Sequence, residues 1–185
     1  MANHIEAIHA VTDRRILIQG PKLDSATMER VSREVFELNK TTGDILVVFD
    51  SPGGRHIDGK TLFDVFRTSR EKVIGMVQGI ADSAAFIALL GCHVKLATHY
   101  STFVVHNSEM TYEGRIKYTS SAKEYLKTFK RRVNLLRRER IWLISLILKK
   151  TKGKISRREL SKLLDEDRRI DADEAIKLGF IDGIV

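Results

Sequence analysis

The sequence predicts an α/β fold in which helices alternate with the strands of a mostly parallel sheet. Continuous apolar runs at 45–49 and 73–77 are typical of strands that are covered on both faces. A segment with apolar residues at helical spacing follows each run. This alternation of strand and helix favours parallel strands joined by right-handed crossovers.

The first half of the chain supplies most of the predicted sheet. Strands are expected at 15–20, 45–49, 73–77, 93–97 and 102–105. Helices are expected between them, from Asp24 or Ser25 as N-cap to Leu38, around 62–66 and over 84–90. The order of these elements places the ends of several strands along one edge of the sheet.

The second half begins with a long helix, predicted from Tyr118 to Lys150. Its apolar residues recur in steps of four and three and form one stripe, typical of a helix-on-helix contact: Ala122, Leu126, Phe129, Val133 and Leu136. The stripe runs into 141–148, which is apolar nearly all round. Because a chain of this size has little core to spare, we expect self-association to cover that segment. Beyond Gly153, helices are expected around 160–164 and over 172–178, before a strand at 180–185.

Length and composition predict a single domain, 1–185, with an ordinary hydrophobic core. The net charge is +8, and the segment 113–150 accounts for it, with 12 Lys or Arg against three Asp or Glu. We interpret this segment as a solvated helix face rather than a nucleic-acid-binding surface, which would be the functional alternative.

Cysteine use and hydropathy indicate the compartment. Cys92 is the only cysteine, so no internal disulfide can form and a reducing environment is expected. The first residues lack the pattern of a signal peptide, and no apolar run reaches the length of a membrane span. These observations predict a cytoplasmic protein.

Three strand ends carry residues suited to acyl transfer. Gly53-Gly54 follows one strand and can bring a backbone amide close to a ligand. Ser83 follows the next strand and opens a helix, where free amides favour negative charge. His106 ends a third strand. The structural alternatives are a tight turn, a capping serine and a core histidine.

Other polar residues qualify this interpretation. Asp165-Glu166-Asp167 offers carboxylates that could orient an imidazole, although such a run is usually only solvated. Asp82 competes for the helix cap and adds negative charge beside any oxyanion, which argues against catalysis. No set of His, Cys, Asp and Glu has zinc spacing, so we predict no metal.

These motifs together resemble the ClpP family, the proteolytic subunit of the caseinolytic (Clp) protease, from about Arg15 to Val185. The matching segments are Ser51-Pro52-Gly53-Gly54, Gly79-Ile80-Ala81-Asp82-Ser83-Ala84-Ala85-Phe86, Phe103-Val104-Val105-His106-Asn107 and the C-terminal stretch from Asp167 to Asp182. Their order along the chain matches that of the family.

The resemblance implies a ClpP/crotonase fold, with repeated β-β-α units, a mostly parallel sheet and a protruding handle helix at about 113–150. It implies a catalytic triad of Ser83, His106 and Asp167, with an oxyanion hole formed by the amides of Gly54 and Ala84. Substrate contacts are then expected from the residues beside these positions: Gly53, Arg55, His56 and Asn107. No cofactor is implied.

The sequence departs from the family pattern at several positions. Asp82 replaces a small apolar residue, Ala84-Ala85 stands where Met-Gly is common, and Glu166 stands where a ring-coupling arginine is usual. The handle region is basic and longer than usual by roughly three helical turns. The family implies an AAA+ unfoldase as partner, whereas the short N-terminal gating segment argues against docking of one.

The leading functional hypothesis is a serine endopeptidase that cleaves peptides or unfolded polypeptides inside a chamber of self-associated rings. One alternative is an inactive or catalytically weak ClpP-like subunit. The other is a crotonase-like acyl-CoA enzyme, which would share the fold but would not need both Ser83 and His106.

Overall fold

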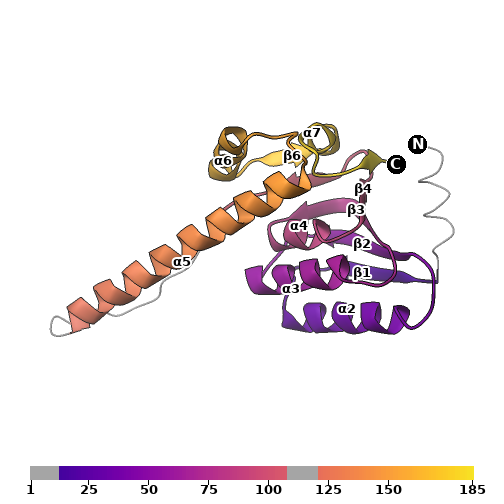
Figure 1. Cartoon of the computed structure of the whole chain (residues 1–185), viewed down its shortest axis with the longest axis horizontal. Coiled ribbons are helices and arrows are strands. Elements are labelled where there is room, and N and C mark those ends of the chain that lie inside the picture. The colour runs from indigo at the N-terminus through magenta and orange to yellow at the C-terminus, as the bar shows by residue number, and fades with distance from the viewer. Residues whose placement is uncertain (1–12, 108–120) are drawn as a thin grey trace.

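The protein, described by a computed structural model for residues 13–107 and 121–185, has the predicted α/β fold (Figure 1). The strands are β1 (Arg15–Gln19), β2 (Ile45–Ser51), β3 (Val73–Asp82), β4 (Val94–Ala97), β5 (Thr102–Val104), β6 (Arg169–Asp171) and β7 (Gly183–Ile184). The helices are α2 (Ser25–Leu38), α3 (His56–Arg67), α4 (Ala84–Leu89), α5 (Ser121–Lys150), α6 (Arg157–Glu166) and α7 (Ala172–Leu178).

The sheet has the order β1-β2-β3-β4-β7, and all of these neighbours are parallel. Strand β3 is ten residues long and has two partners on one side. Its first half pairs with β4, and its last residues, Ile80–Asp82, pair with β5, which in turn pairs antiparallel with β6. The prediction ended this strand at Val77, because Gln78 and Gly79 interrupt the apolar run. The extension of β3 brings the end of β5 beside Ser83.

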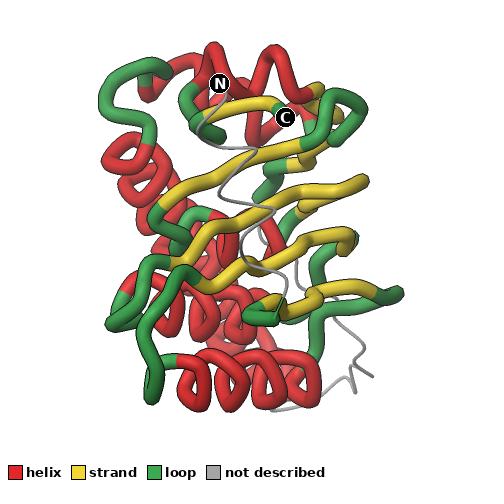
Figure 2. The backbone as a smooth tube through the Cα atoms, turned by 90° about the vertical axis from the view of Figure 1, so that its right-hand side faces the viewer, coloured by secondary structure: helices red, strands yellow, loops and turns green. Residues whose placement is uncertain are grey.

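The alternation of side chains along the strands divides the core between the two faces of the sheet. Ile45, Val47 and Phe49 of β2 belong to the main core, whereas Leu46 and Val48 join a smaller cluster on the opposite face. Figure 2 shows the strands side by side with helices behind them. Burial on both faces explains why β2 is apolar at every position from 45 to 49.

Helix α5 leaves the sheet as a long arm (Figure 1), and its C-terminal part packs against the main core. Leu143, Ile144 and Ile147 are buried within the chain, so the expectation that self-association covers 141–148 was wrong for these residues. The core has room because α6, α7 and β6 extend it beyond the sheet. Ile141 remains 60% exposed. Residues 118–120, where the prediction began this helix, lie outside the described residues.

Two C-terminal elements differ from the prediction. Strand β6 was not predicted, because three residues of the pattern polar-apolar-polar carry too little periodicity to be recognised. The closing strand is limited to β7, since only Leu96 and Ala97 of β4 pair with it. Among the described helices, none is long and apolar enough to cross a membrane.

Candidate active site

The turn from β3 to α4 presents Ser83. Its φ of 52° and ψ of −117° form a positive-φ conformation that is uncommon for residues other than glycine and that often marks functional sites. The Ser83 amide donates to the Val104 carbonyl at 2.8 Å, which fixes the turn against β5. Ser83 is the N-cap residue of α4, yet its side chain makes no capping hydrogen bond. The capping alternative therefore does not explain this serine.

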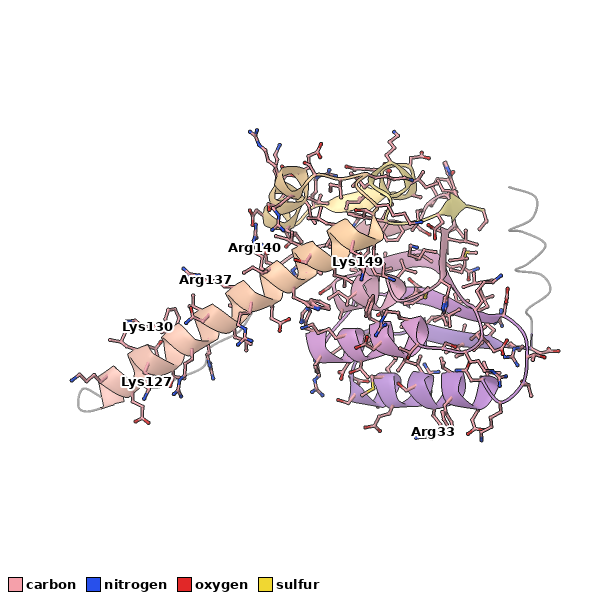
Figure 3. All side chains as sticks on the ribbon, viewed as in Figure 1. Arg33, Lys127, Lys130, Arg137, Arg140 and Lys149 are labelled. Carbon is pink, nitrogen blue, oxygen red and sulfur yellow. The ribbon has the colours of Figure 1, made fainter. Side chains whose placement is uncertain are left out.

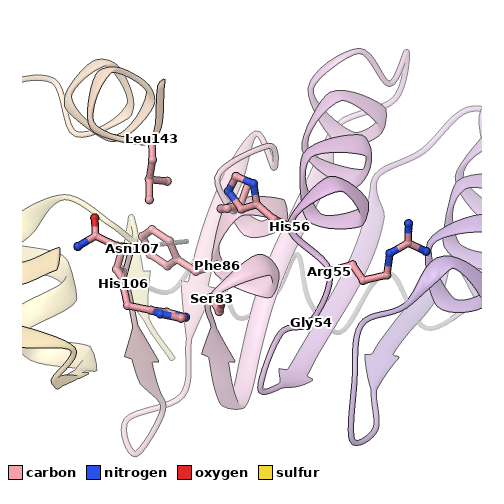
Figure 4. A pocket seen from close by; sticks show the side chains of 10 residues that line it. Gly54, Arg55, His56, Ser83, Phe86, His106, Asn107 and Leu143 are labelled. Atoms are coloured by element: carbon pink, nitrogen blue, oxygen red, sulfur yellow. The ribbon is translucent and has the colours of Figure 1, made fainter. Parts of the chain in front are cut away.

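His106 lies beside Ser83 because β5 pairs with the end of β3. Figure 4 shows the imidazole directed toward the Ser83 side chain. On its other side, His106 Nδ1 is 3.9 Å from Asp167 Oδ1. Asp167 terminates α6 with a left-handed φ of 49°, and its side chain is 60% exposed. A separation of 3.9 Å exceeds hydrogen-bond length.

The Gly53-Gly54 turn directs one backbone amide away from the neighbouring segment. Leu23 accepts from the Arg55 amide at 3.0 Å and donates to the Gly53 carbonyl at 2.7 Å. In a trans peptide the N–H points opposite to the C=O, so the Gly54 N–H points away from Leu23. Gly54 lines the same pocket as Ser83. The amide is thus available to a ligand there.

A second amide comes from the start of α4. The Ala84 N–H belongs to the first turn of the helix, where backbone amides have no intrahelical partner. The partial positive charge of the helix N-terminus adds to its capacity to stabilise an anion. Gly54 and Ala84 therefore offer two donors around Ser83.

Gly54, Ser83 and His106 line a pocket of about 270 Å³, and Ala84 directly follows Ser83. Its walls are formed by Gly54, Arg55, His56, Ser83, Phe86, Ile87, Val105, His106, Asn107 and Leu143 (Figure 4). The far side is apolar, from Phe86 and Ile87 of α4 and Leu143 of α5. The arrangement can hold a substrate side chain next to a hydroxyl, an imidazole and two amides.

His56 lines this pocket and carries one buried ring nitrogen that has no hydrogen-bond partner. Its Nδ1 lies 3.1 Å from Glu139 Oε2 of α5, and its Nε2 is buried with no hydrogen-bond partner. Burial, reinforced by Lys60, lowers the pKa of His56 below its usual value despite the Glu139 carboxylate. The neutral ring with its proton on Nδ1, facing the carboxylate, presents Nε2 as an acceptor.

The other residues expected to contact substrate differ in how they lie. Gly53 packs so tightly that a Cβ there would lie 2.5 Å from the Asp82 carbonyl oxygen and 2.9 Å from Ser83 Cβ. Arg55 lines the pocket, but its side chain points away from Ser83 (Figure 4) and contacts Ser25 and Asp58. Gly53 thus positions the serine turn, whereas the Arg55 guanidinium is directed elsewhere.

Asn107 is anchored by a polar cluster. Its amide donates to the Leu164 carbonyl at 3.1 Å and to Asp165 Oδ1 at 3.0 Å. Arg140 of α5 donates to Asn107 Oδ1 and to Asp165 Oδ1, both at 2.6 Å. This cluster ties the segment after β5 to α6, and so sets the separation between His106 and Asp167.

Asp82 faces away from the serine pocket and toward β6. Its carboxylate lies 3.2 Å from Arg169 Nη2, because β3, β5 and β6 place residues 82, 104 and 169 in register. Burial raises the pKa of Asp82, an effect that Arg169 opposes. Arg169 thus compensates part of the negative charge that argued against catalysis, while Oδ1 remains buried without a partner.

Sequence reasoning missed the contribution of α5. It treated Glu139 and Arg140 only as members of a charged helix face, and Trp142 only as part of an apolar run. Trp142 packs edge-on against His56, with 5.8 Å between ring centroids. No local signal could reveal these contacts, since they join residues 25 or more positions apart. Within 13–107 and 121–185, no group of three or more His, Cys, Asp or Glu side chains could hold a metal ion.

A mostly parallel sheet whose strand ends bring a hydroxyl and an imidazole together, with a carboxylate from the end of α6 beside the imidazole, carries the parts that hydrolases use for acyl transfer. The comparison with known families is specific. The Clp protease family model matches residues 2–185, and the chain belongs to that family.

Curated relatives and a solved structure agree with this assignment. The chain is 28% identical to the ATP-dependent Clp protease proteolytic subunit 1 of Protochlamydia amoebophila, covering all of this chain and 86% of that protein. It is 27% identical to the corresponding subunit of Streptococcus mutans, over 94% of this chain and 85% of that one. A ClpP1 mutant from Listeria monocytogenes has a similar fold, with a TM-score of 0.78, 19% identity and coverage of 97% and 95%.

Proposed function

We propose that this protein is a serine endopeptidase with Ser83 as nucleophile, His106 as general base and Asp167 as the residue that orients the base. One observation carries the proposal. The uncapped Ser83 hydroxyl lines a pocket that His106 and the amide of Gly54 also face, at the N-terminus of α4. Family membership supports the same chemistry, because the relatives are named protease subunits.

The reaction follows from the positions of these groups. Ser83 Oγ attacks the peptide carbonyl while His106 takes its proton, and the amides of Gly54 and Ala84 stabilise the oxyanion. His106 then protonates the leaving amine, which departs and leaves an acyl group on Ser83. Water, activated by the same imidazole, releases the acid product and restores the hydroxyl.

Asp167 must approach His106 more closely for full activity. A movement of about 1 Å would convert the present 3.9 Å separation into a hydrogen bond. The high exposure of Asp167 leaves room for such a movement, and catalytic hydrogen bonds commonly tighten only in the substrate complex. We expect substrate binding or assembly to supply it.

The substrates we propose are peptides or unfolded polypeptides, cleaved inside an assembly of rings. Exposed apolar residues on the arm of α5, Leu126 at 55% and Phe129 at 49%, support contact with another subunit. The relatives are named ATP-dependent, which supports including an AAA+ unfoldase as a partner in this proposal.

A fluorophosphonate probe followed by mass spectrometry tests the nucleophile. We expect labelling of Ser83, and loss of both labelling and peptide turnover in Ser83→Ala with unchanged native mass. Ser145→Ala is the matched control, because Ser145 is an exposed serine on α5 outside the pocket. Labelling elsewhere, or full turnover by Ser83→Ala, would contradict the proposal.

A second candidate is a catalytically weak subunit that assembles with an active paralogue. The long His106–Asp167 separation and the partnerless Asp82 Oδ1 favour it. Size-exclusion chromatography of the protein alone, with a peptide-cleavage assay on each fraction, distinguishes the two. An assembled but inactive particle would select this candidate. A crotonase-like acyl-CoA enzyme is disfavoured, since it would not require Ser83 and His106 to share a pocket.

A further inference from the structure

A second, larger pocket of about 520 Å³ lies at the end of the sheet opposite Ser83. It surrounds the start of β4, whereas Ser83 follows the end of the parallel strand β3. Lys149, near the C-terminal end of α5 in Figure 3, lies at its wall. Its ionisable lining residues are one carboxylate, one thiol, one imidazole and six cations: Asp182, Cys92, His93, Arg67, Lys95, Lys149, Lys150, Lys152 and Lys154.

Only two of the six cations have carboxylate partners among the described residues. Lys95 Nζ lies 2.8 Å from Asp182 Oδ2, and Arg67 Nη2 lies 2.8 Å from Asp64 Oδ1. The pairing of Asp182 uses the one carboxylate that lines the pocket. Four lysines from the end of α5 and the following turn, Lys149, Lys150, Lys152 and Lys154, make no ion pair within 13–107 and 121–185.

Helix ends compensate part of this charge. The pocket wall includes the last residues of α3 and α5 and the residues that follow α4 and α7, so four helix C-termini face it. Each helix C-terminus carries roughly −0.5 charge, about −2 in total. Against four unpaired ammonium groups, that leaves an excess of about two positive charges. The helix dipoles therefore neutralise only part of the positive charge of these lysines.

The backbone holds the lysines around the hollow. Lys152 has a left-handed φ of 51°, a conformation that is unfavourable for lysine. Lys154 lies against Gly179, where a Cβ would come within 2.9 Å of the Lys154 Cδ atom. Lys150 is half-buried, with its ammonium 5.1 Å from the Phe63 ring. Burial, together with the neighbouring Lys95, lowers the pKa of Lys150, as expected for a half-buried cation beside another cation.

We propose that this basic pocket binds a small phosphate-bearing anion with two or more negative charges, such as the phosphates of a di- or triphosphate. Lysine ammonium groups bind phosphate as point charges, and a phosphoryl group offers several oxygens to several of them at once. A concave site of this volume suits a small molecule, whereas an acidic protein partner would require a broader surface. A single carboxylate would neutralise only half of the excess charge.

Calorimetric titration in 150 mM KCl tests the proposal, with inorganic tripolyphosphate, ATP without magnesium, and sulfate as separate ligands. We expect saturable binding of tripolyphosphate and much weaker binding of sulfate. The double variant Lys152→Gln/Lys154→Gln should weaken binding about tenfold or more, because both side chains are exposed and their loss should not disturb the core. Lys22→Gln/Lys130→Gln, with the same change in net charge away from the pocket, is the control and should change affinity less than twofold.

The ligands also separate two sources of the phosphate. Equal affinity for ATP and tripolyphosphate would support recognition of the phosphates of a nucleotide, and preference for tripolyphosphate would support an inorganic oligophosphate. Absence of saturable binding at this salt concentration would overturn the proposal. Equal weakening in the two double variants would do the same, since binding would then follow net charge alone. None of these measurements depends on peptidase activity.

Discussion

Gly53→Ala is the sharpest test of how the turn that carries Ser83, between β3 and α4, is packed. The substitution adds one methyl group at a position with a φ of 86°, in a turn that packs against the chain from Asp82 to Ala84. The new Cβ would lie 2.5 Å from the Asp82 carbonyl oxygen, 2.9 Å from the Ala84 nitrogen and 2.9 Å from Ser83 Cβ. These are backbone and near-backbone atoms, which cannot rotate away as a flexible side chain would.

The expected loss in the free energy of unfolding has two parts. A left-handed conformation costs about 1–2 kcal/mol for alanine, and overpacking of a tight contact costs about 1–3 kcal/mol more. Relief of the closest contact requires the two segments to separate by about 1 Å, and a displacement of that size at reacting groups lowers turnover roughly 100-fold. We therefore expect a free energy of unfolding reduced by about 2–5 kcal/mol and a turnover reduced at least 100-fold.

Gly153→Ala separates the two parts. Gly153 has a φ of 83°, nearly the same as Gly53, but a Cβ there would have no atom within 4 Å. This control should lose only the conformational part, about 1–2 kcal/mol, and retain turnover. Urea denaturation and hydrolysis of a fluorogenic peptide measure the two effects. Equal stability loss in both variants, with normal turnover by Gly53→Ala, would refute the close-packing argument.

Three further substitutions probe the surroundings of the site. Arg140→Ala should reduce kcat about tenfold with little change in KM, because Arg140 positions the segment that carries His106 without lining the pocket. Partial recovery of kcat by Arg140→Lys would separate a positioning role from a folding role. A change in KM alone would contradict the positioning role. His56→Val should change the free energy of unfolding by less than about 1 kcal/mol, because it removes a buried Nε2 that has no hydrogen-bond partner while Lys60 still pairs with Glu139; a loss of several kcal/mol in urea titrations would contradict this. For Asp82 the pKa is raised on folding, so the folded state binds more protons and this group favours folding increasingly as pH falls toward 3.8. The free energy of unfolding of wild type relative to Asp82→Asn should therefore rise as pH is lowered from 7 to 4 in urea titrations, and a difference that falls instead would reverse the assignment.

The elements that the sequence predicted well are those whose burial gives a simple hydrophobic pattern, either a continuous apolar run or a helical repeat. β2 is apolar at every position because both of its faces are covered, and α2 buries Val31 and Val35 at helical spacing. The position of Ser83 between a strand and a helix was also readable, since the apolar run 73–77 precedes it and the apolar segment 84–90 follows it. The continuation of β3 to Asp82 was not readable, because its pairing with β5 depends on tertiary contact rather than on hydrophobicity.

Polar contacts between distant segments were beyond sequence reasoning. His56 was expected to contact substrate. Its contact with Glu139 could not be predicted, because it depends on how α5 crosses the start of α3. The ion pair of Asp82 with Arg169 depends on β6, a strand too short to predict. In both cases a long-range geometry decides which charge neutralises which. A single sequence without that geometry leaves each charged residue with many candidate partners.

Helix α5 links the features that remained separate in the sequence. Glu139, Arg140 and Leu143 lie within little more than one helical turn and reach His56, Asn107 and the pocket wall, respectively. Because these contacts lie where the arm joins the core, any partner that binds the exposed residues Leu126 and Phe129 acts on a helix that is anchored beside the pocket of Ser83. A helix is stiff over this distance, so its tilt and the position of its anchoring side chains change together. Assembly through the arm would then bear directly on the His106–Asp167 separation, which Arg140 and Asp165 help to set.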